Sequence, residues 1–223
     1  RGSYNSISPS FASAAASPFA YYKFHVGEGG MRVPLIIANV AGQERGAVVE
    51  AFTWATDIAP TLLAAAGVSP PEGRFGGRPV LPMSGKNLLP VLRGEASAAY
   101  GPEESIGYEL TGHGVLFQGD YKARRHAPPV GEGRWALYNI VLDPGETEDL
   151  SAQEPERLAR MVAAYEAFEV SHGVQPIPPG YSQIGQLASN MFVARLREPL
   201  LTVLLTALIL LAAAGWLRRG RSS

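Results

Sequence analysis

The chain has 223 residues, of which 46% are hydrophobic and 17% are charged, and it contains 25 glycines and 18 prolines. This composition is typical of a folded domain with many turns, and it excludes collagen-like, coiled-coil and wholly disordered chains. The formal net charge is −1 and no long basic block is present, so nucleic acid is not expected as a partner. Cysteine is absent, which excludes disulfides and a cysteine nucleophile within these residues. The first residue is Arg1 and not Met, and we therefore expect a fragment whose beginning is missing.

The first hundred residues predict a strand, a helix and a long loop. The apolar and branched run at 33–38 predicts a strand. The segment 57–66 predicts a helix, because an acid and a proline lie in its first turn and a glycine follows its last residue. Many prolines and glycines predict a loop over 68–104, with one helical turn at 88–92.

A small sheet and a covering helix are predicted next. Four short segments separated by turn residues predict an antiparallel meander, at 105–110, 114–118, 121–125 and 135–140. The segment 154–172 predicts a helix whose apolar side chains recur every three or four positions. We therefore expect the helix to lay one apolar stripe over the sheet.

The C-terminal part predicts a linker and a membrane anchor. Prolines and a glycine favour a linker over 174–198. The run 199–217 contains no charged residue, and as a helix it would extend about 28 Å, close to the thickness of a bilayer core. A buried core helix is the alternative. The arginines of 218–223 favour a cytoplasmic tail, so a single-pass protein with its folded part in the periplasm or outside the cell is expected.

The sequence offers few residues with obvious chemistry. The four histidines lack the spacing of metal ligands, so no metal site is predicted; we expect His126 and His172 to be solvated and His113 to be a turn residue. Paired glycines at 29–30 precede the predicted strand, and Lys23 and His25 lie close to this turn. A cationic cluster on a tight turn can hold a tetrahedral anion, whereas a solvated loop charge is the alternative for Lys23.

Several motifs occur together in one order along 18–173. They are Lys23-x4-Glu28-Gly29-Gly30-x-Arg32-Val33-Pro34, Asp57-x2-Pro60-Thr61-Leu62-Leu63, Gly119-Asp120-Tyr121-Lys122, Trp135-x-Leu137-Tyr138-Asn139 and Asp143-Pro144-Gly145-Glu146-Thr147-Glu148-Asp149-Leu150. In this combination the chain resembles the C-terminal portion of the sulfatase family, of the arylsulfatase type in the alkaline-phosphatase superfamily. The resemblance implies an α/β fold, with 1–104 as the end of the α/β domain and 105–173 as a small subdomain of four antiparallel strands packed on a helix.

The resemblance also implies hydrolysis of sulfate esters, with a formylglycine nucleophile and a calcium ion as cofactors. It assigns the sulfate contact to Lys23 and leaves His25 as a weaker substrate-binding candidate beside it. Glu28, Gly29, Gly30 and Arg32 match the same motif, and we interpret them as structural, forming a turn and a local ion pair that orient Lys23.

The chain departs from the family where the chemistry would lie. The family's nucleophile motif is Cys/Ser-x-Pro-x-Arg, and the nearest segment here is Ser69-Pro70-Pro71-Glu72-Gly73, which ends in glycine. No Asp-Asn pair for a metal is present either. We therefore expect a C-terminal fragment of a membrane-anchored sulfatase that is inactive alone. A phosphate- or phosphonate-ester hydrolase of the same superfamily and a non-catalytic, membrane-tethered binding domain remain as alternatives.

Overall fold

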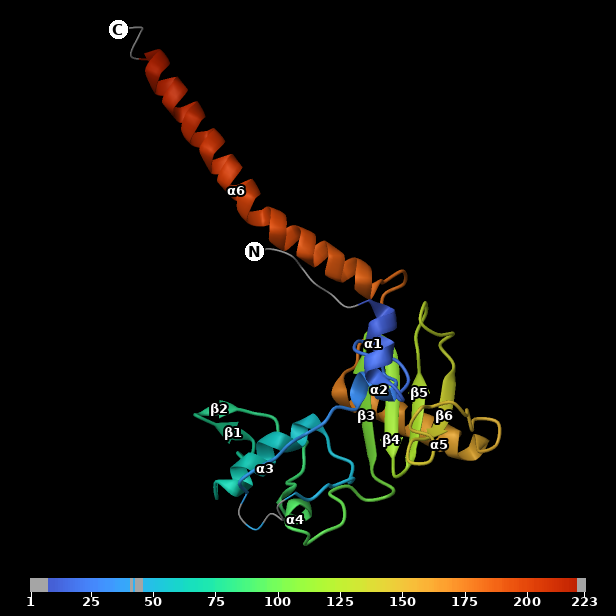
Figure 1. Ribbon diagram of the computed structural model, residues 1–223. Coiled ribbons are helices and arrows are strands. Elements are labelled where there is room, and N and C mark those ends of the chain that lie inside the picture. The colour runs from blue at the N-terminus through green and yellow to red at the C-terminus, as the bar shows by residue number, and fades with distance from the viewer. Residues whose placement is uncertain (1–7, 41, 43–45, 220–223) are drawn as a thin grey trace. The chain divides into compact units, whose positions relative to one another are not determined.

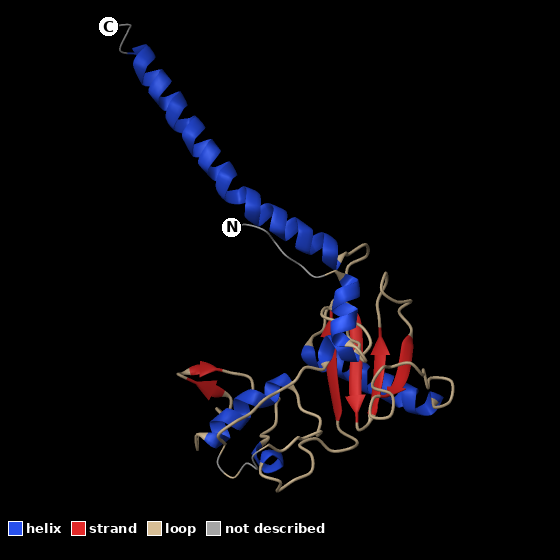
Figure 2. Ribbon diagram, in the orientation of Figure 1, coloured by secondary structure: helices blue, strands red, loops and turns tan. Residues whose placement is uncertain are grey.

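The computed structural model describes residues 8–40, 42 and 46–219; the side chains of 184, 197, 198 and 211–219 lie outside this description (Figure 1). The chain divides into two compact units, Arg1–Val174 and Gln175–Ser223, which are described separately below. Helices and strands alternate with long loops in the first unit, and the second unit contains one helix (Figure 2).

A four-stranded antiparallel sheet forms the centre of the first unit, in the order β3-β4-β5-β6. Its strands are β3 (Ser105–Leu110), β4 (His113–Gln118), β5 (Tyr121–Arg125) and β6 (Trp135–Asn139). Consecutive strands pair directly, and the tight β4–β5 turn places Gln118 opposite Tyr121. Gly119 takes a φ of 55° in this turn, a conformation that favours glycine. The predicted meander is confirmed.

Each face of the sheet carries a buried apolar cluster. On one face Leu116, Ala123 and Leu137 pack against Met161 and Tyr165 of α5 (Pro155–His172), two residues that are fully buried and one helical turn apart. Pro155 begins this helix, and Gly173 ends it with a φ of 64°. The predicted covering helix is confirmed.

The opposite face of the sheet packs on the N-terminal half of the unit. Val115 and Phe117 of β4 form a second core with the fully buried Val26, and Phe52 and Trp54 pack against it. Val26 thereby holds the segment with the paired glycines against the sheet. The sheet is therefore buried on both sides, which explains why nearly every residue of β4 is inaccessible to solvent.

The remaining elements of this unit are short. They are α1 (Pro9–Ala16), α2 (Glu28–Met31), the 3-10 helix η1 (Ala55–Asp57), α3 (Ile58–Ala65), β1 (Arg74–Phe75), β2 (Arg78–Pro79) and α4 (Leu89–Leu92). The helix predicted at 57–66 and the helical turn at 88–92 are confirmed by α3 and α4.

The strand predicted at 33–38 is wrong. This segment has no regular structure, and Val33 and Ile36 are 76% and 91% exposed. A strand is stable only when a neighbouring strand satisfies its backbone groups, and no described strand pairs with these residues. The apolar and branched residues of this segment favour a strand, but no described strand lies beside it to pair with it.

The second unit corrects the prediction of a linker over 174–198. Helix α6 runs from Gln183 to Arg219, and only the residues before it lack regular structure. The prolines and the glycine that favoured a linker all lie before 181, and the residues after them include many good helix formers. Among the residues that the structure describes, none of the helices combines the length and the apolar character that a membrane span requires. Part of the predicted span, 211–217, lies outside the described side chains.

Candidate functional site

Lys23 is carried by a tight loop between α1 and α2. Its side chain is exposed, and the Nζ atom lies 5.0 Å from the centre of the Phe24 ring. Tyr21 and Phe24 have φ angles of 66° and 77°, a left-handed conformation that is uncommon for residues other than glycine. Such a loop persists only when its surroundings determine its shape.

The paired glycines of α2 hold this loop in place by close backbone contact. The Gly29 N–H donates to the Ala20 carbonyl at 2.8 Å. A Cβ atom at Gly29 would collide with the carbonyl oxygen of Tyr21, and one at Gly30 would collide with that of His25. Only glycine allows the helix to approach the loop so closely. The motif around Glu28 therefore shapes the backbone that presents Lys23.

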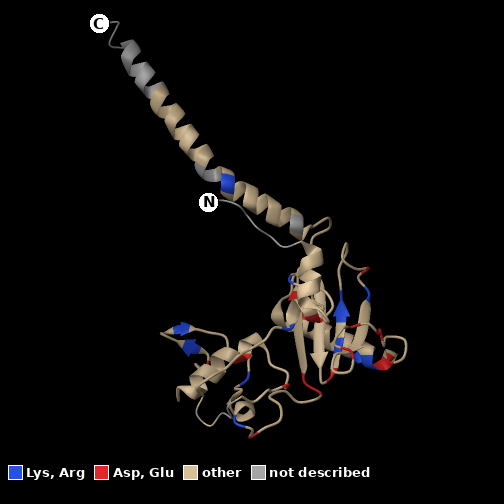
Figure 3. Ribbon diagram, in the orientation of Figure 1, with Lys and Arg blue, Asp and Glu red and all other residues tan. Residues whose placement is uncertain are grey.

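A buried ion network fastens the same turn to the sheet. The Lys122 Nζ lies 2.8 Å from Oε1 of Glu28 and 3.2 Å from Oε1 of Glu146, and the guanidinium of Arg124 lies 3.0 Å from Oε2 of Glu146. Glu146 also accepts the Glu28 backbone N–H at 2.7 Å. Two carboxylates and two cations balance each other, which is the condition under which buried charges are tolerated. In Figure 3, the strand β5, which supplies both cations, is blue at its lysine and arginine positions and tan elsewhere.

The local ion pair predicted between Glu28 and Arg32 is present at 3.9 Å, but Lys122 is the nearer partner of Glu28. Lys122, Arg124 and Glu146 were not predicted as partners of this turn. Lys122 and Glu146 nevertheless lie in the Gly119-Asp120-Tyr121-Lys122 and Asp143-Pro144-Gly145-Glu146 motifs, which were the available signal.

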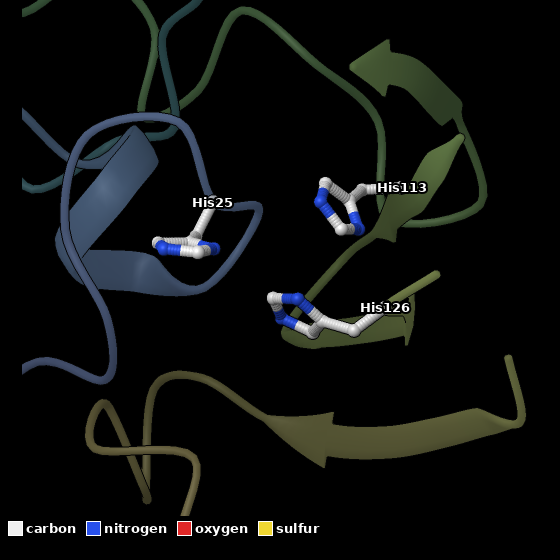
Figure 4. Close-up of side chains that lie close together, drawn as sticks. All are labelled: His25, His113 and His126. Carbon is white, nitrogen blue, oxygen red and sulfur yellow. The ribbon is translucent and has the colours of Figure 1, made fainter. Parts of the chain in front are cut away.

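Three histidines meet beside this network (Figure 4). The ring centres of His113 and His126 are 5.2 Å apart, and those of His25 lie 6.2 and 6.1 Å from them. Each ring offers one nitrogen, and these three nitrogens lie within 4.8 Å of one another. His126 also stacks on Tyr21 at 4.3 Å.

Two predictions for these histidines are wrong. His113 is 4% exposed and begins β4, and His126 is 6% exposed and directly follows β5. The register pairs Gly114 with Arg125, so the next pair beyond it brings His113 and His126 together where the inner strands β4 and β5 meet at one end of the sheet. Burial follows because the loop with His25 covers these strand ends.

The pKa of each of the three imidazoles is lowered. Burial lowers the pKa of His25, and burial followed by repulsion from a protonated His25 lowers the pKa of His113. Burial first, and then the nearby Arg124, lower the pKa of His126 to about 3. The Nδ1 atom of His113 accepts the Ala127 backbone N–H at 2.9 Å. By contrast, Nδ1 of His25 and both ring nitrogens of His126 have no hydrogen-bond partner among the described residues.

A small open hollow of about 190 Å³ borders the cluster. Tyr21, Arg124, His126, Trp135 and Tyr138 contribute to its walls. His126 is therefore reached from the surface, although its side chain is almost fully buried.

The cofactors implied by the resemblance do not fit these residues. Calcium prefers carboxylate and carbonyl oxygens. In the part of the chain that the structure describes, the three histidines are the only group of three or more His, Cys, Asp or Glu side chains close enough to share an ion. The sequence also contains no Cys/Ser-x-Pro-x-Arg segment from which formylglycine could be made.

The curated proteins that this sequence resembles are sulfatases. No family model matches the sequence. An uncharacterized sulfatase of Schizosaccharomyces pombe is 31% identical over 184 residues, which cover 81% of this chain and 33% of that protein. An arylsulfatase of Klebsiella aerogenes is 36% identical over 93 residues, which cover 41% of this chain and 20% of that enzyme. This chain thus spans a third or less of the length of these curated relatives.

A solved structure shares the fold. The crystal structure of Ps i-CgsB in complex with k-i-k-neocarrahexaose superposes with a TM-score of 0.56 and 24% identity, covering 68% of this chain and 32% of that one. The curated relatives belong to the family that the ordered sequence motifs indicate, and the shared fold agrees with it. Over about four fifths of its length, the chain is a relative of the sulfatase family.

Proposed function

We propose that these residues form part of an enzyme that hydrolyses sulfate esters, in which Lys23 contacts the sulfate group. The observation that carries the proposal is that a buried ion network and two closely packed glycines fix the turn behind Lys23, while its ammonium group remains exposed. A fixed cation stabilises the charge on the sulfate oxygens more strongly in the transition state than a mobile one, because no reorganisation is needed.

The proposal assigns the substrate contact to this chain and the hydrolytic chemistry to residues outside it. This sequence contains no formylglycine motif and no Asp-Asn metal pair, so it supplies substrate contact and framework, and hydrolysis requires residues outside it. The isolated chain is therefore expected to show no turnover of an aryl sulfate, even with calcium added. Turnover by the isolated chain would contradict this part of the proposal.

The test is the change Lys23→Ala in the complete enzyme. Loss of one anion-stabilising donor is expected to lower kcat/KM for an aryl sulfate by roughly 10²-fold. Lys23→Arg, which keeps the charge, should recover part of the loss. Arg78→Ala removes an exposed cation on β2 and serves as the control, with unchanged kinetics. Unchanged kinetics of a folded Lys23→Ala enzyme would remove Lys23 from the site.

The same assay separates the alternative activities. A higher turnover of the matched phosphate or phosphonate ester would move the enzyme to that class. Absence of turnover on all three esters would favour a binding domain without catalysis.

We further propose that the uncharged run 199–217 anchors the protein in a bilayer, with the folded part on the periplasmic or extracellular side and 218–223 in the cytoplasm. The support is the sequence alone, an uncharged stretch followed by three arginines. The full chain is expected to stay with membranes during alkaline carbonate washing, and a chain ending at Ala194 is expected to be released. Release of the full chain would contradict the anchor.

A further inference from the structure

Three imidazole side chains converge from three separate segments of the chain. His25 comes from the loop before α2, His113 from the first position of β4, and His126 from the residue after β5. Their nearest available nitrogens lie within 4.8 Å of one another, and two of the three rings are less than a tenth exposed. The sulfate contact proposed for Lys23 uses none of these rings.

Two of the three rings lack partners that buried polar groups normally have. Nδ1 of His25 and both ring nitrogens of His126 find no hydrogen-bond partner among the described residues. A buried polar atom without a partner is costly, so such atoms point to a ligand.

Neutral imidazoles present lone pairs, and a lone pair binds a cation. Hard cations such as calcium and magnesium take oxygen ligands, whereas zinc, copper, nickel and iron suit imidazole. Three imidazoles with one remaining open position are a known ligand set for zinc. The chemistry of the donors therefore selects a transition metal and not the calcium implied by the family resemblance.

We propose that His25, His113 and His126 bind one divalent transition-metal ion, with zinc as the preferred ion, through one nitrogen of each ring. Zinc–nitrogen bonds of about 2.0–2.1 Å hold two tetrahedral ligand atoms about 3.4 Å apart. The three rings must therefore move closer together when the ion binds. The ion would join the loop that carries Lys23 to the ends of β4 and β5.

His113 differs from the other two histidines because its ring already has a hydrogen-bond partner. Its Nδ1 accepts the Ala127 N–H, so the neutral ring carries its hydrogen on Nε2. Ligation through Nε2 moves that hydrogen to Nδ1 and breaks the bond to Ala127. His113 therefore gives less to the affinity than His25 and His126, whose free nitrogens lose no partner on binding.

The experiment measures metal binding by the full chain, produced without a histidine tag and stripped with a chelator. Calorimetric titration with zinc is expected to show one ion per chain and a rise in melting temperature, with no response to calcium or magnesium. Cobalt is expected to give the visible absorption bands of a four- or five-coordinate ion. His25→Gln and His126→Gln should each lower the affinity at least tenfold, and His113→Gln should lower it less.

His172→Gln is the matched control, because this exposed histidine lies at the end of α5, outside the cluster. Its affinity should be unchanged. Circular dichroism reports whether each variant folds; if His126→Gln does not, His25→Gln on the less buried loop decides the test. Absence of zinc binding by the original chain, or unchanged binding by folded His25→Gln, overturns the proposal. The experiment measures metal binding and not turnover, so a failure of the metal proposal can be distinguished from a failure of the sulfatase proposal.

Discussion

The Nζ atom of Lys122 lies 2.8 Å from Oε1 of Glu28, although 94 positions separate the two residues in the sequence. Both side chains are almost fully buried, and Glu146 joins them from a third segment. The turn that presents Lys23 is therefore fixed by charges supplied by the small sheet. The part of the chain that contacts the sulfate group in our proposal depends on the subdomain beside it.

The first prediction concerns this pair. Lys122→Met keeps much of the side-chain volume but leaves Glu28 and Glu146 without their shared cation, and the loss of one partner of a buried pair costs about 3–5 kcal/mol. The free energy of unfolding, measured by urea denaturation, should fall by that amount.

Arg134→Gln is its control. This arginine pairs with Glu132 at 2.9 Å, but both side chains are more than three quarters exposed. Exposed pairs contribute about 0–1 kcal/mol, so the variant should unfold almost as the original chain does. Equal losses in the two variants would contradict the importance assigned to burial.

The second prediction concerns the paired glycines. Gly30→Ala places a Cβ against the carbonyl oxygens of His25 and Tyr22, which are backbone atoms and cannot move aside cheaply. We expect a loss of at least about 2 kcal/mol in the free energy of unfolding, within the range for strain at a closely packed position. Gly101→Ala, where a Cβ would meet nothing within 4 Å, should change it by less than about 0.5 kcal/mol. A stable Gly30→Ala chain would show that the loop can shift to make room.

The sheet and its covering helix were predictable because their signals are local. Turn residues separate the strands, and the spacing of Met161 and Tyr165 marks the buried side of α5. The strand expected at 33–38 failed because a strand depends on a neighbour that a single segment does not reveal. The linker expected over 174–198 was too long, because the prolines and the glycine that favoured it end at Gly180 and the helix formers that follow them build α6 from Gln183.

The histidine cluster was missed because its members are far apart in the sequence. One signal was nevertheless available. The predicted turn after Gln118 fixes the register of the hairpin, and extending that register places His113 opposite His126. The approach of His25 was not predictable, because it follows from a loop whose shape depends on two positive φ angles and on distant charges.

The third prediction concerns Asp57, which is fully buried in the 3-10 helix η1. Its carboxylate accepts the backbone N–H groups of Trp54 and Lys86 at 2.6 and 2.7 Å and the hydroxyl of Tyr100 at 2.5 Å. Asp57→Ala leaves three donors without an acceptor, and each buried orphan costs about 1–3 kcal/mol. The expected loss in unfolding free energy is therefore at least about 3 kcal/mol. Asp120→Ala, at an exposed turn, is the control and should have little effect; a small loss for Asp57→Ala would mean that water replaces the carboxylate.

The last prediction is a dependence on pH at the turn after β6. Asp143 accepts the N–H groups of Thr147 and Glu148 at 2.6 and 2.8 Å and the Thr147 hydroxyl at 3.0 Å. Burial raises the pKa of Asp143, but these hydrogen bonds outweigh it and hold the pKa below its ordinary value of 3.8. The folded state thus favours the ionised carboxylate, and this contribution is complete above pH 3.8 and is lost as the pH falls through the folded-state pKa.

The comparison that isolates this effect is with Asp143→Asn, which cannot ionise. The original chain should be more stable than the variant by about 1 kcal/mol at pH 7 and pH 5, because hydrogen bonds to a charged acceptor are stronger than those to a neutral one. Urea denaturation near pH 3 should show a smaller difference, since the carboxylate then begins to bind a proton in the folded state as well. A difference that stays constant down to pH 3 would mean that the charge of Asp143 does not stabilise the turn.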